Sequence, residues 1–312
     1  MKSLSSYFKR CLVLGLLALG TTTAWSQREE KTFKVTGTPT VSVSDISGTI
    51  TITGEKISEV RVTSEKKDPK IEIIMEQTGN RVRVEVKHPD RSGVDFSRWF
   101  GGSGDSSDVK IQIVMPDAGN LEARSVSGDV AVSGLRGDIQ VKTVSGDLAL
   151  KNLGERITAE TVSGDIRIDQ ARGEVTLKSI SGDLNAQGLE GRLTTSSVSG
   201  DSKILQSNLF FTSAETTSGD LYMETPLARS GSYTLNSHSG DVTVRIPKSS
   251  SFRLTAKTFS GDFRSEFTQP VTENIAGESN RHTGHSISST FGSGDADLRV
   301  RTFSGNLKIQ AQ

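Results

Sequence analysis

The sequence has little of what usually holds a chain of 312 residues together. It contains one cysteine, seven prolines and only 5% aromatic residues, and hydrophobic residues make up 33%. Basic and acidic side chains balance at 37 each, which argues against a nucleic-acid-binding protein with its usual basic excess. The low hydrophobic content excludes a polytopic membrane protein. The absence of net charge is not typical of a disordered chain.

The N-terminus has the layout of a secretory signal peptide. Lys2, Lys9 and Arg10 precede an apolar run over residues 11–20, and small residues follow as far as Ser26. This run is too short to span a bilayer as a helix. We therefore expect cleavage after Ser26, with an uncleaved anchor as the alternative. Cleavage would remove three basic residues and leave a net charge of −3.

Cleavage would also remove the only cysteine. Cys11 stands at the start of the apolar run, whereas a lipidated cysteine would stand at its end. We expect an exported protein in the periplasm, at the outer-membrane surface or outside the cell. We expect no disulfides and no thiol catalysis in it.

A repeat dominates the rest of the chain. Ser-Gly-Asp recurs at a spacing of eighteen residues and then of nineteen to twenty-one. The glycines of this series are Gly128, Gly146, Gly164, Gly182, Gly200, Gly219, Gly240 and Gly261. Gly48 belongs to an early copy, and Gly305 in Phe-Ser-Gly-Asn closes the series. Such a period indicates a solenoid, in which stacked units bury a core that no single unit could bury.

Within each unit, apolar and polar residues alternate with period two, as in β-strands. The first unit predicts strands near 130–132 and 139–144, separated by turns that contain glycine. No proline occurs between residues 117 and 225, as expected for strands paired on both sides. Equivalent apolar positions form columns, which begin at Val130, Val132, Leu135 and Ile139. We expect a further inward column at Val126, Val144, Val162, Ile180 and Val198, with His238 as a partly buried member.

We predict an all-β fold, a parallel β-solenoid of about ten coils of 18–22 residues with a strand-pair excursion near the N-terminus. A right-handed β-helix is favoured over a left-handed helix of hexapeptides. The hexapeptide rule requires apolar residues where Asp138, Arg156, Glu174 and Arg192 stand. The predicted parts are a signal peptide (1–26), N-terminal coils with the strand pair and a loop at 89–108 (27–122), and the Ser-Gly-Asp solenoid with an insertion near 267–292 (123–312).

The aspartates of the repeat form a column of like charges: Asp129, Asp147, Asp165, Asp183, Asp201, Asp220, Asp241 and Asp262. Strands lie about 4.8 Å apart, and carboxylates at that spacing repel by about 1 kcal/mol per pair even in water. Turn chemistry, in which Asp oxygens accept backbone N–H groups, is the first interpretation. A calcium ladder and a pair of catalytic carboxylates are the alternatives. We predict no cofactor, with calcium as the one alternative.

Residues 89–108 interrupt the repeat and carry the candidate binding residues. Arg91, Phe96, Arg98, Trp99 and Phe100 combine arginine with aromatic rings, which is the usual content of binding hot spots. The alternative is an aromatic segment that covers one end of the solenoid. We predict no catalytic and no metal-binding residues.

These features resemble a bacterial exported β-strand-repeat family of unknown function, usually labelled "putative adhesin". The likeness covers residues 33–312 and is strongest from Ser127-Gly128-Asp129 to Ser199-Gly200-Asp201. It implies a β-helix-like fold and a cell-envelope or surface location, and it carries over no catalytic residue. Asn306 in place of the last Asp and the insertion in the last coil depart from the pattern.

The sequence therefore predicts a non-catalytic adhesion or scaffolding module of the cell envelope. It would bind envelope or surface polymers or proteins, but not nucleic acid, through exposed sheet faces or the loop around Trp99. The alternatives are a polysaccharide-active β-helix enzyme and a calcium-stabilised surface repeat protein. A narrow rod needs only about one apolar residue in three, which accounts for the sparse hydrophobic composition.

Overall fold

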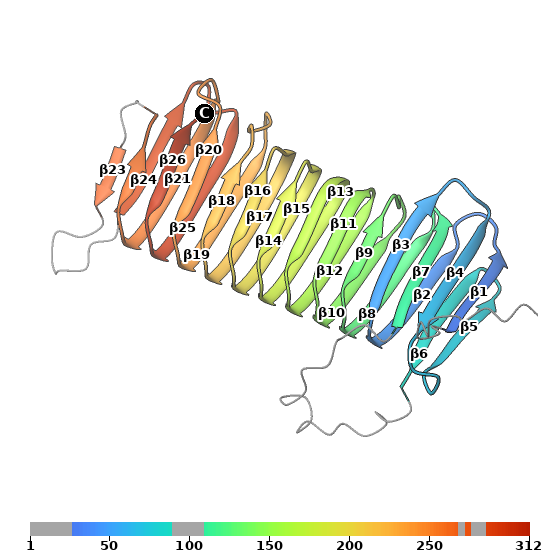
Figure 1. Ribbon diagram of the computed structural model, residues 1–312. Coiled ribbons are helices and arrows are strands. Elements are labelled where there is room, and N and C mark those ends of the chain that lie inside the picture. Colours follow the sequence, from blue (N-terminus) through green and yellow to red (C-terminus); the bar gives the residue numbers. More distant parts are fainter. Residues whose placement is uncertain (1–26, 89–108, 268–271, 276–284) are drawn as a thin grey trace, which may run out of the picture.

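The computed structural model describes residues 27–88, 109–267, 272–275 and 285–312, and these form a long rod of β-strands (Figure 1). The described residues contain 26 strands and no helix. The predicted all-β, solenoid-like fold is confirmed, whereas its handedness, its number of coils and the division into parts stay predictions. Among the described residues, no helix is long and apolar enough to cross a membrane.

Two long sheets form the two faces of the rod, and β13 runs from one sheet into the other. Sheet A contains, in spatial order, β1 (Gln27–Lys34), β4 (Glu59–Lys66), β7 (Val109–Pro116), β3 (Thr49–Glu55), β9 (Val130–Ser133), β11 (Leu148–Leu153), β13 (Ile166–Ser181), β14 (Leu184–Gln187), β16 (Ser202–Leu205), β18 (Leu221–Glu224), β20 (Val242–Ile246), β26 (Leu307–Ala311) and β22 (Phe263–Ser265). Sheet B contains β5 (Glu72–Thr78), β6 (Arg81–Lys87), β2 (Thr40–Ser47), β8 (Asn120–Ser127), β10 (Ile139–Ser145), β12 (Arg156–Ser163), β13, β15 (Glu190–Ser199), β17 (Asn208–Ser218), β19 (Ser232–Ser239), β25 (Ala296–Ser304), β21 (Phe252–Ser260), β24 (His285–Phe291) and β23 (Thr272–Ile275).

The eighteen-residue repeat sets the register of the parallel strands. Ile139 pairs with Ile157, which in turn pairs with Val175, so equivalent residues of successive units lie above one another. The columns that begin at Val130, Val132, Leu135 and Ile139 are buried, as predicted. The core is therefore a set of straight apolar columns enclosed between the two sheets.

The column that contains Val144 does not face the core, and that prediction is wrong. Val144, Val162, Ile180 and Val198 are 37–52% exposed, and His238 in the same column is exposed as well. In β10 the odd-numbered residues from Ile139 onward point inward, so position 144 points outward. The small polar residue before it takes the inward place. Strand alternation decides the direction of these side chains, although they are apolar.

The order of the coils in space differs from their order in the chain at both ends of the rod. The coil of β6 and β7 lies outside the coil of β2 and β3, which is the one that pairs with β8 and β9. At the other end, β25 and β26 insert between the coil of β19 and β20 and the coil of β21 and β22. Gly305 thus lies between Gly240 and Gly261 and does not close the series as predicted.

Antiparallel strands cover both sheets at the N-terminal end of the rod, and sheet B alone at the C-terminal end of the part that the structure describes. At the N-terminal end, β4 pairs with β7, β1 with β4, and β5 with β6, which accounts for the predicted strand-pair excursion. At the C-terminal end, β24 pairs with β21 and β23 with β24. These strands occupy the hydrogen-bonding edges that bare coils would expose.

Candidate binding surfaces

The Ser-Gly-Asp turns follow one long edge of the rod and are tied together by their aspartates. The Oδ1 atom of each Asp accepts the backbone N–H of the Asp in the next coil at 2.8–3.0 Å, from Asp129 through to Asp241. Asn306 continues the series, because its N–H donates to Asp241 and its Oδ1 accepts the N–H of Asp262. The aspartates thus accept backbone N–H groups, as in the turn interpretation, but the donor belongs to the neighbouring coil and not to the same turn. Among the described residues, no group of three His, Cys, Asp or Glu side chains could hold a metal ion.

Hydrogen bonds also offset the repulsion within the column. At Asp241, the Asn306 N–H and the neighbouring Lys308 ammonium hold the pKa of the carboxyl below its usual value. Arg167 lies 2.8 Å from Asp165 and 3.9 Å from Asp147. The column of like charges is therefore tolerated because each carboxylate from Asp129 to Asp241 accepts a backbone N–H, and Arg264 lies 3.8 Å from Asp262. The calcium alternative stays untested.

An acceptor role for the column predicts a difference between two variants of Asp183. Asp183→Ala removes the acceptor of the Asp201 N–H and should destabilise the fold by about 1–2 kcal/mol. Asp183→Asn keeps an oxygen there, as Asn306 does naturally, and removes one like charge, so it should cost less than about 0.5 kcal/mol. Urea unfolding measures both values. Equal losses in the two variants, together with a wild-type midpoint that falls on adding EDTA, would instead favour the calcium ladder.

One buried position departs from the repeat. Inside each Ser-Gly-Asp turn lies a buried hydroxyl residue, and these are Ser125, Thr143, Thr161, Ser179, Ser197, Thr216, Ser237, Thr302 and Thr258. In β2 the equivalent residue is Asp45, whose side chain is fully buried. Its Oδ1 accepts the N–H groups of Ile46 at 2.7 Å and Ser47 at 3.2 Å, and His88 Nε2 lies 3.6 Å away.

Burial raises the pKa of Asp45, although the two backbone donors and His88 act in the opposite direction. The turn of this coil has Thr49 where the other units have Asp. Asp45 therefore caps its own turn from the inside. The Asp45–His88 pair was not predicted from the sequence. The available indication was an Asp at a position where the other units have Ser or Thr.

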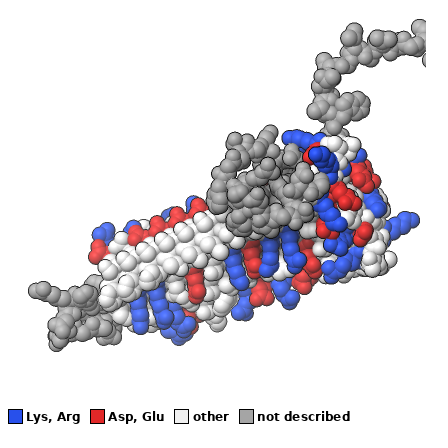
Figure 2. Space-filling view, turned by 90° about the horizontal axis from the view of Figure 1, so that it is seen from below, with Lys and Arg blue, Asp and Glu red and all other residues white. Residues whose placement is uncertain are grey.

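An apolar ridge runs along the turn edge on its sheet B side. We define it as the outward column Val126, Val144, Val162, Ile180, Val198, Thr217, His238, Phe303 and Phe259. At its C-terminal end the Phe303 ring stacks on His238 at 5.0 Å and on Phe259 at 4.8 Å between centroids. Viewed from below, the part of the edge nearer the C-terminal end shows an uncharged band bordered by charged rows (Figure 2). This band combines the ridge with the Ser and Gly columns of the repeat.

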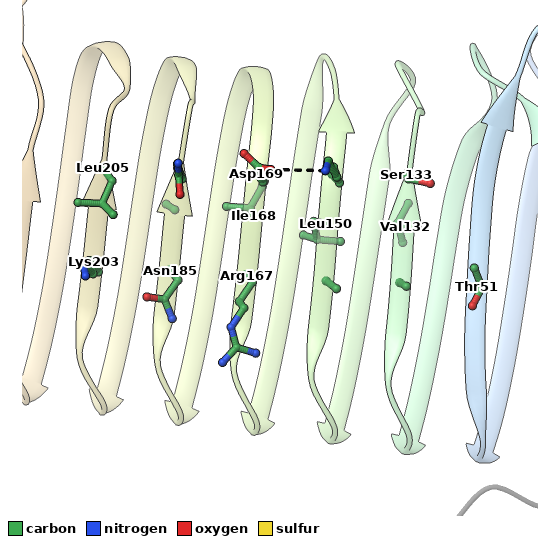
Figure 3. A pocket seen from close by; sticks show the side chains of 15 residues that line it. Thr51, Val132, Ser133, Leu150, Arg167, Ile168, Asp169, Asn185, Lys203 and Leu205 are labelled. Atoms are coloured by element: carbon green, nitrogen blue, oxygen red, sulfur yellow. Dashed lines mark ion pairs between the residues drawn. The ribbon is translucent and has the colours of Figure 1, made fainter.

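A groove crosses the outer face of sheet A from β3 to β16 and has a volume of about 470 Å³ (Figure 3). It is hollow because the outward residues of β9 and β11 include Ala131 and Ala149, which fill little space. Its polar lining residues include Ser133, Lys151, Arg167, Asp169, Asn185, Gln187 and Lys203, and its apolar ones include Leu205 and the buried residues Val132, Leu150, Ile168 and Ala186. We call this surface the sheet A groove.

The sheet A groove offers several hydrogen-bond donors, and three cationic side chains and one carboxylate line it. Lys151 lies 3.8 Å from Asp169, and Arg167 pairs with Asp165 of the turn edge, which leaves Lys203 as the cation without a carboxylate partner among these ion pairs. The Lys203 ammonium also lies 5.8 Å from the centre of the Tyr222 ring, beyond the end of the groove. The groove thus combines amides, cations and a neighbouring aromatic ring over several coils.

The predicted hot spot lies in the segment that joins β6 to β7. Arg91, Phe96, Arg98, Trp99 and Phe100 lie outside the described residues. The ends of β6 and β7 adjoin the Ser47-Gly48 turn. A binding role for it stays a prediction.

The solenoid matches a known protein family. The family model described as Toastrack DUF4097 matches residues 38–310, nearly the whole of the described chain. The chain belongs to the Toastrack DUF4097 family. This confirms the resemblance inferred from the repeat. The search of the curated proteins found no match.

Solved structures similar to this Toastrack protein include two described as putative adhesins. One, from Parabacteroides distasonis ATCC 8503, is 11% identical with a TM-score of 0.54, and the match covers 92% of this chain and 98% of that one. The other, from Bacteroides fragilis NCTC 9343, is 12% identical with a TM-score of 0.47 and covers the same shares. At this identity the first match shows a shared fold and nothing further.

Proposed function

We propose that this Toastrack protein is a non-catalytic binding module of the cell envelope that holds an extended envelope or surface polymer in the sheet A groove. The observation that carries the proposal is the groove itself, which is hollow across several coils and combines amide and cationic side chains with apolar surface. A polymer laid along the rod would contact side chains of several successive coils. The predicted signal peptide and the names of the similar structures support an exported, adhesive role.

The lining of the groove also favours binding over catalysis. Retaining and inverting glycosidases both need two carboxyl groups about the scissile bond. The groove is lined by one carboxylate, Asp169, and Lys151 already pairs with it. The net positive lining suits a polymer that carries hydroxyl and anionic groups.

Filling the groove should abolish binding without disturbing the core. Ala149 is exposed on the outer face, so Ala149→Trp adds volume to the groove alone. We expect at least a tenfold loss of binding to isolated envelope polymers in co-sedimentation, and a smaller loss for Arg167→Ala. The control is Thr176→Trp, which adds the same ring to the outer face of sheet B. Unchanged binding by a folded Ala149→Trp variant, or an equal loss in the control, would refute the assignment.

A further inference from the structure

The apolar ridge exposes more contiguous apolar surface than a monomeric rod needs. Val162, Ile180 and Val198 are 43%, 52% and 50% exposed, and Phe303 is 49% exposed. Register places the ridge residues of successive coils next to one another, so these side chains form a continuous row. Soluble monomers rarely expose long apolar patches, and those that do occur mark interaction sites.

The shape of the ridge limits what can cover it. It is straight, it repeats at the strand spacing of about 4.8 Å, and the Ser and Gly columns beside it carry no charge (Figure 2). A covering surface must offer an equally long and regular apolar row. A second copy of the same edge has that length, that period and that lack of charge.

We propose that two copies of this protein associate side by side, ridge against ridge, with their rods parallel. The two-fold axis would run along the rods, so that each ridge residue meets its equivalent in the other copy. Such an isologous contact needs one self-complementary patch. This surface is separate from the sheet A groove and would leave it open.

The charged columns on either side of the ridge decide the orientation. On one side lies the Asp column. On the other side, two residues before each ridge residue, lies a mixed column whose charged members are Arg124, Lys142, Glu160, Lys178, Glu215, Arg301 and Lys257. Glu160 lies 2.7 Å from Lys142 and 3.8 Å from Lys178 in its own chain.

In a parallel pair, the Asp column of one copy faces the mixed column of the other at the same height. Asp129, Asp147, Asp183 and Asp262 would then oppose Arg124, Lys142, Lys178 and Lys257, whereas only Asp165 and Asp220 would oppose acidic residues, Glu160 and Glu215. An antiparallel pair would set Asp column against Asp column, and like charges at close range repel. An anionic membrane is disfavoured for the same reason, because the Asp column borders the ridge along its length.

Disulfide trapping tests both the pairing and its direction. Cys11 is the only cysteine, so the full chain with Cys11→Ser is a cysteine-free background. Single Val126→Cys, Val162→Cys and Val198→Cys variants should each form a covalent dimer under mild oxidation, because a parallel pair brings every residue to its equivalent. Thr176→Cys, on the outer face of sheet B, is the control and should stay monomeric. A covalent dimer from only one of the three cysteine variants would refute the parallel arrangement, because an antiparallel pair brings equivalent residues together at one position along the rod only.

Sedimentation of the unmodified chain tests the ridge without cysteine. The Ile180→Gln, Val198→Gln double variant changes outward side chains only, so it should fold as the wild type does by circular dichroism. We expect its dimer dissociation constant to rise at least tenfold. The proposal would be refuted if the wild-type chain remained monomeric at about 100 μM, which is roughly a hundred times a dissociation constant of about 1 μM. Ridge-dependent flotation of that monomer with anionic vesicles would instead assign the ridge to lipid.

Discussion

Replacing Gly164 by alanine should destabilise the solenoid by about 3 kcal/mol or more. Losses of this size arise from specific mechanisms, such as backbone strain at an unusual φ. Gly164 has a φ of +145°, which side chains rarely adopt, and a Cβ there would lie 2.2 Å from the carbonyl oxygen of Gly146. That oxygen belongs to the backbone of the neighbouring coil. Relief would require the two coils to separate, and the hydrogen bonds between them resist separation.

The matched control for this prediction is Gly154→Ala. The nearest atom to a Cβ at Gly154 is 3.5 Å away, and its φ is not in the left-handed region. We expect its effect to lie within about 0.5 kcal/mol of zero, as for an unconstrained surface site. Urea and thermal unfolding measure both variants. Similar losses in the two would show that close stacking of the glycines does not hold the turn edge together.

Deleting residues 296–312 should unfold the C-terminal coils, although ordinary chain termini tolerate removal. This segment forms β25 and β26, which lie between two other coils and pair with strands on both sides. The deletion removes the buried residues Leu298, Val300, Leu307 and Ile309. The burial of each side chain contributes about 1.5–3 kcal/mol. The four together therefore contribute roughly as much free energy as the net stability of a whole domain.

Deletion of residues 27–34 is the control for this truncation. That segment forms β1, an outermost strand that pairs with β4 alone and is exposed except at Phe33. We expect a much smaller fall in melting temperature and an unchanged protease-resistant core. The C-terminal deletion should instead aggregate, because it exposes the unpaired edges of β19 and β20. A C-terminal deletion that melts as cooperatively as the wild type would contradict the observed insertion of this coil.

Much of the fold could be read from the repeat because the repeat is local. A period of eighteen residues sets the register of every parallel pair from β8 to β16, and the alternation within each unit sets most of the inward columns. The prediction that Val144 and His238 point inward is wrong because it follows the hydrophobicity of the column. The alternation of side chains along the strand is the reliable guide to their direction.

The candidate binding surfaces could be predicted only in outline. The sequence predicts exposed sheet faces, but the sheet A groove depends on two small residues, Ala131 and Ala149, that come from different coils and lie side by side. The Asp45–His88 contact joins residues from β2 and from the end of β6. Contacts of this kind follow from the order in which coils stack, which no local pattern specifies.

The amino-acid sequence by itself determined the strand content, the register of the repeat and the column of Asp turns, because each follows from side chains at a fixed spacing along the chain. Only the tertiary structure decided the order of the coils at the two ends. There β2 pairs with β8 and β19 with β25, which are distant in sequence, and the intervening segments supply antiparallel strands that cover edges of the coils. The same end arrangement places Gly305 and Phe303 inside the stack, and so extends the apolar ridge to the C-terminal coils.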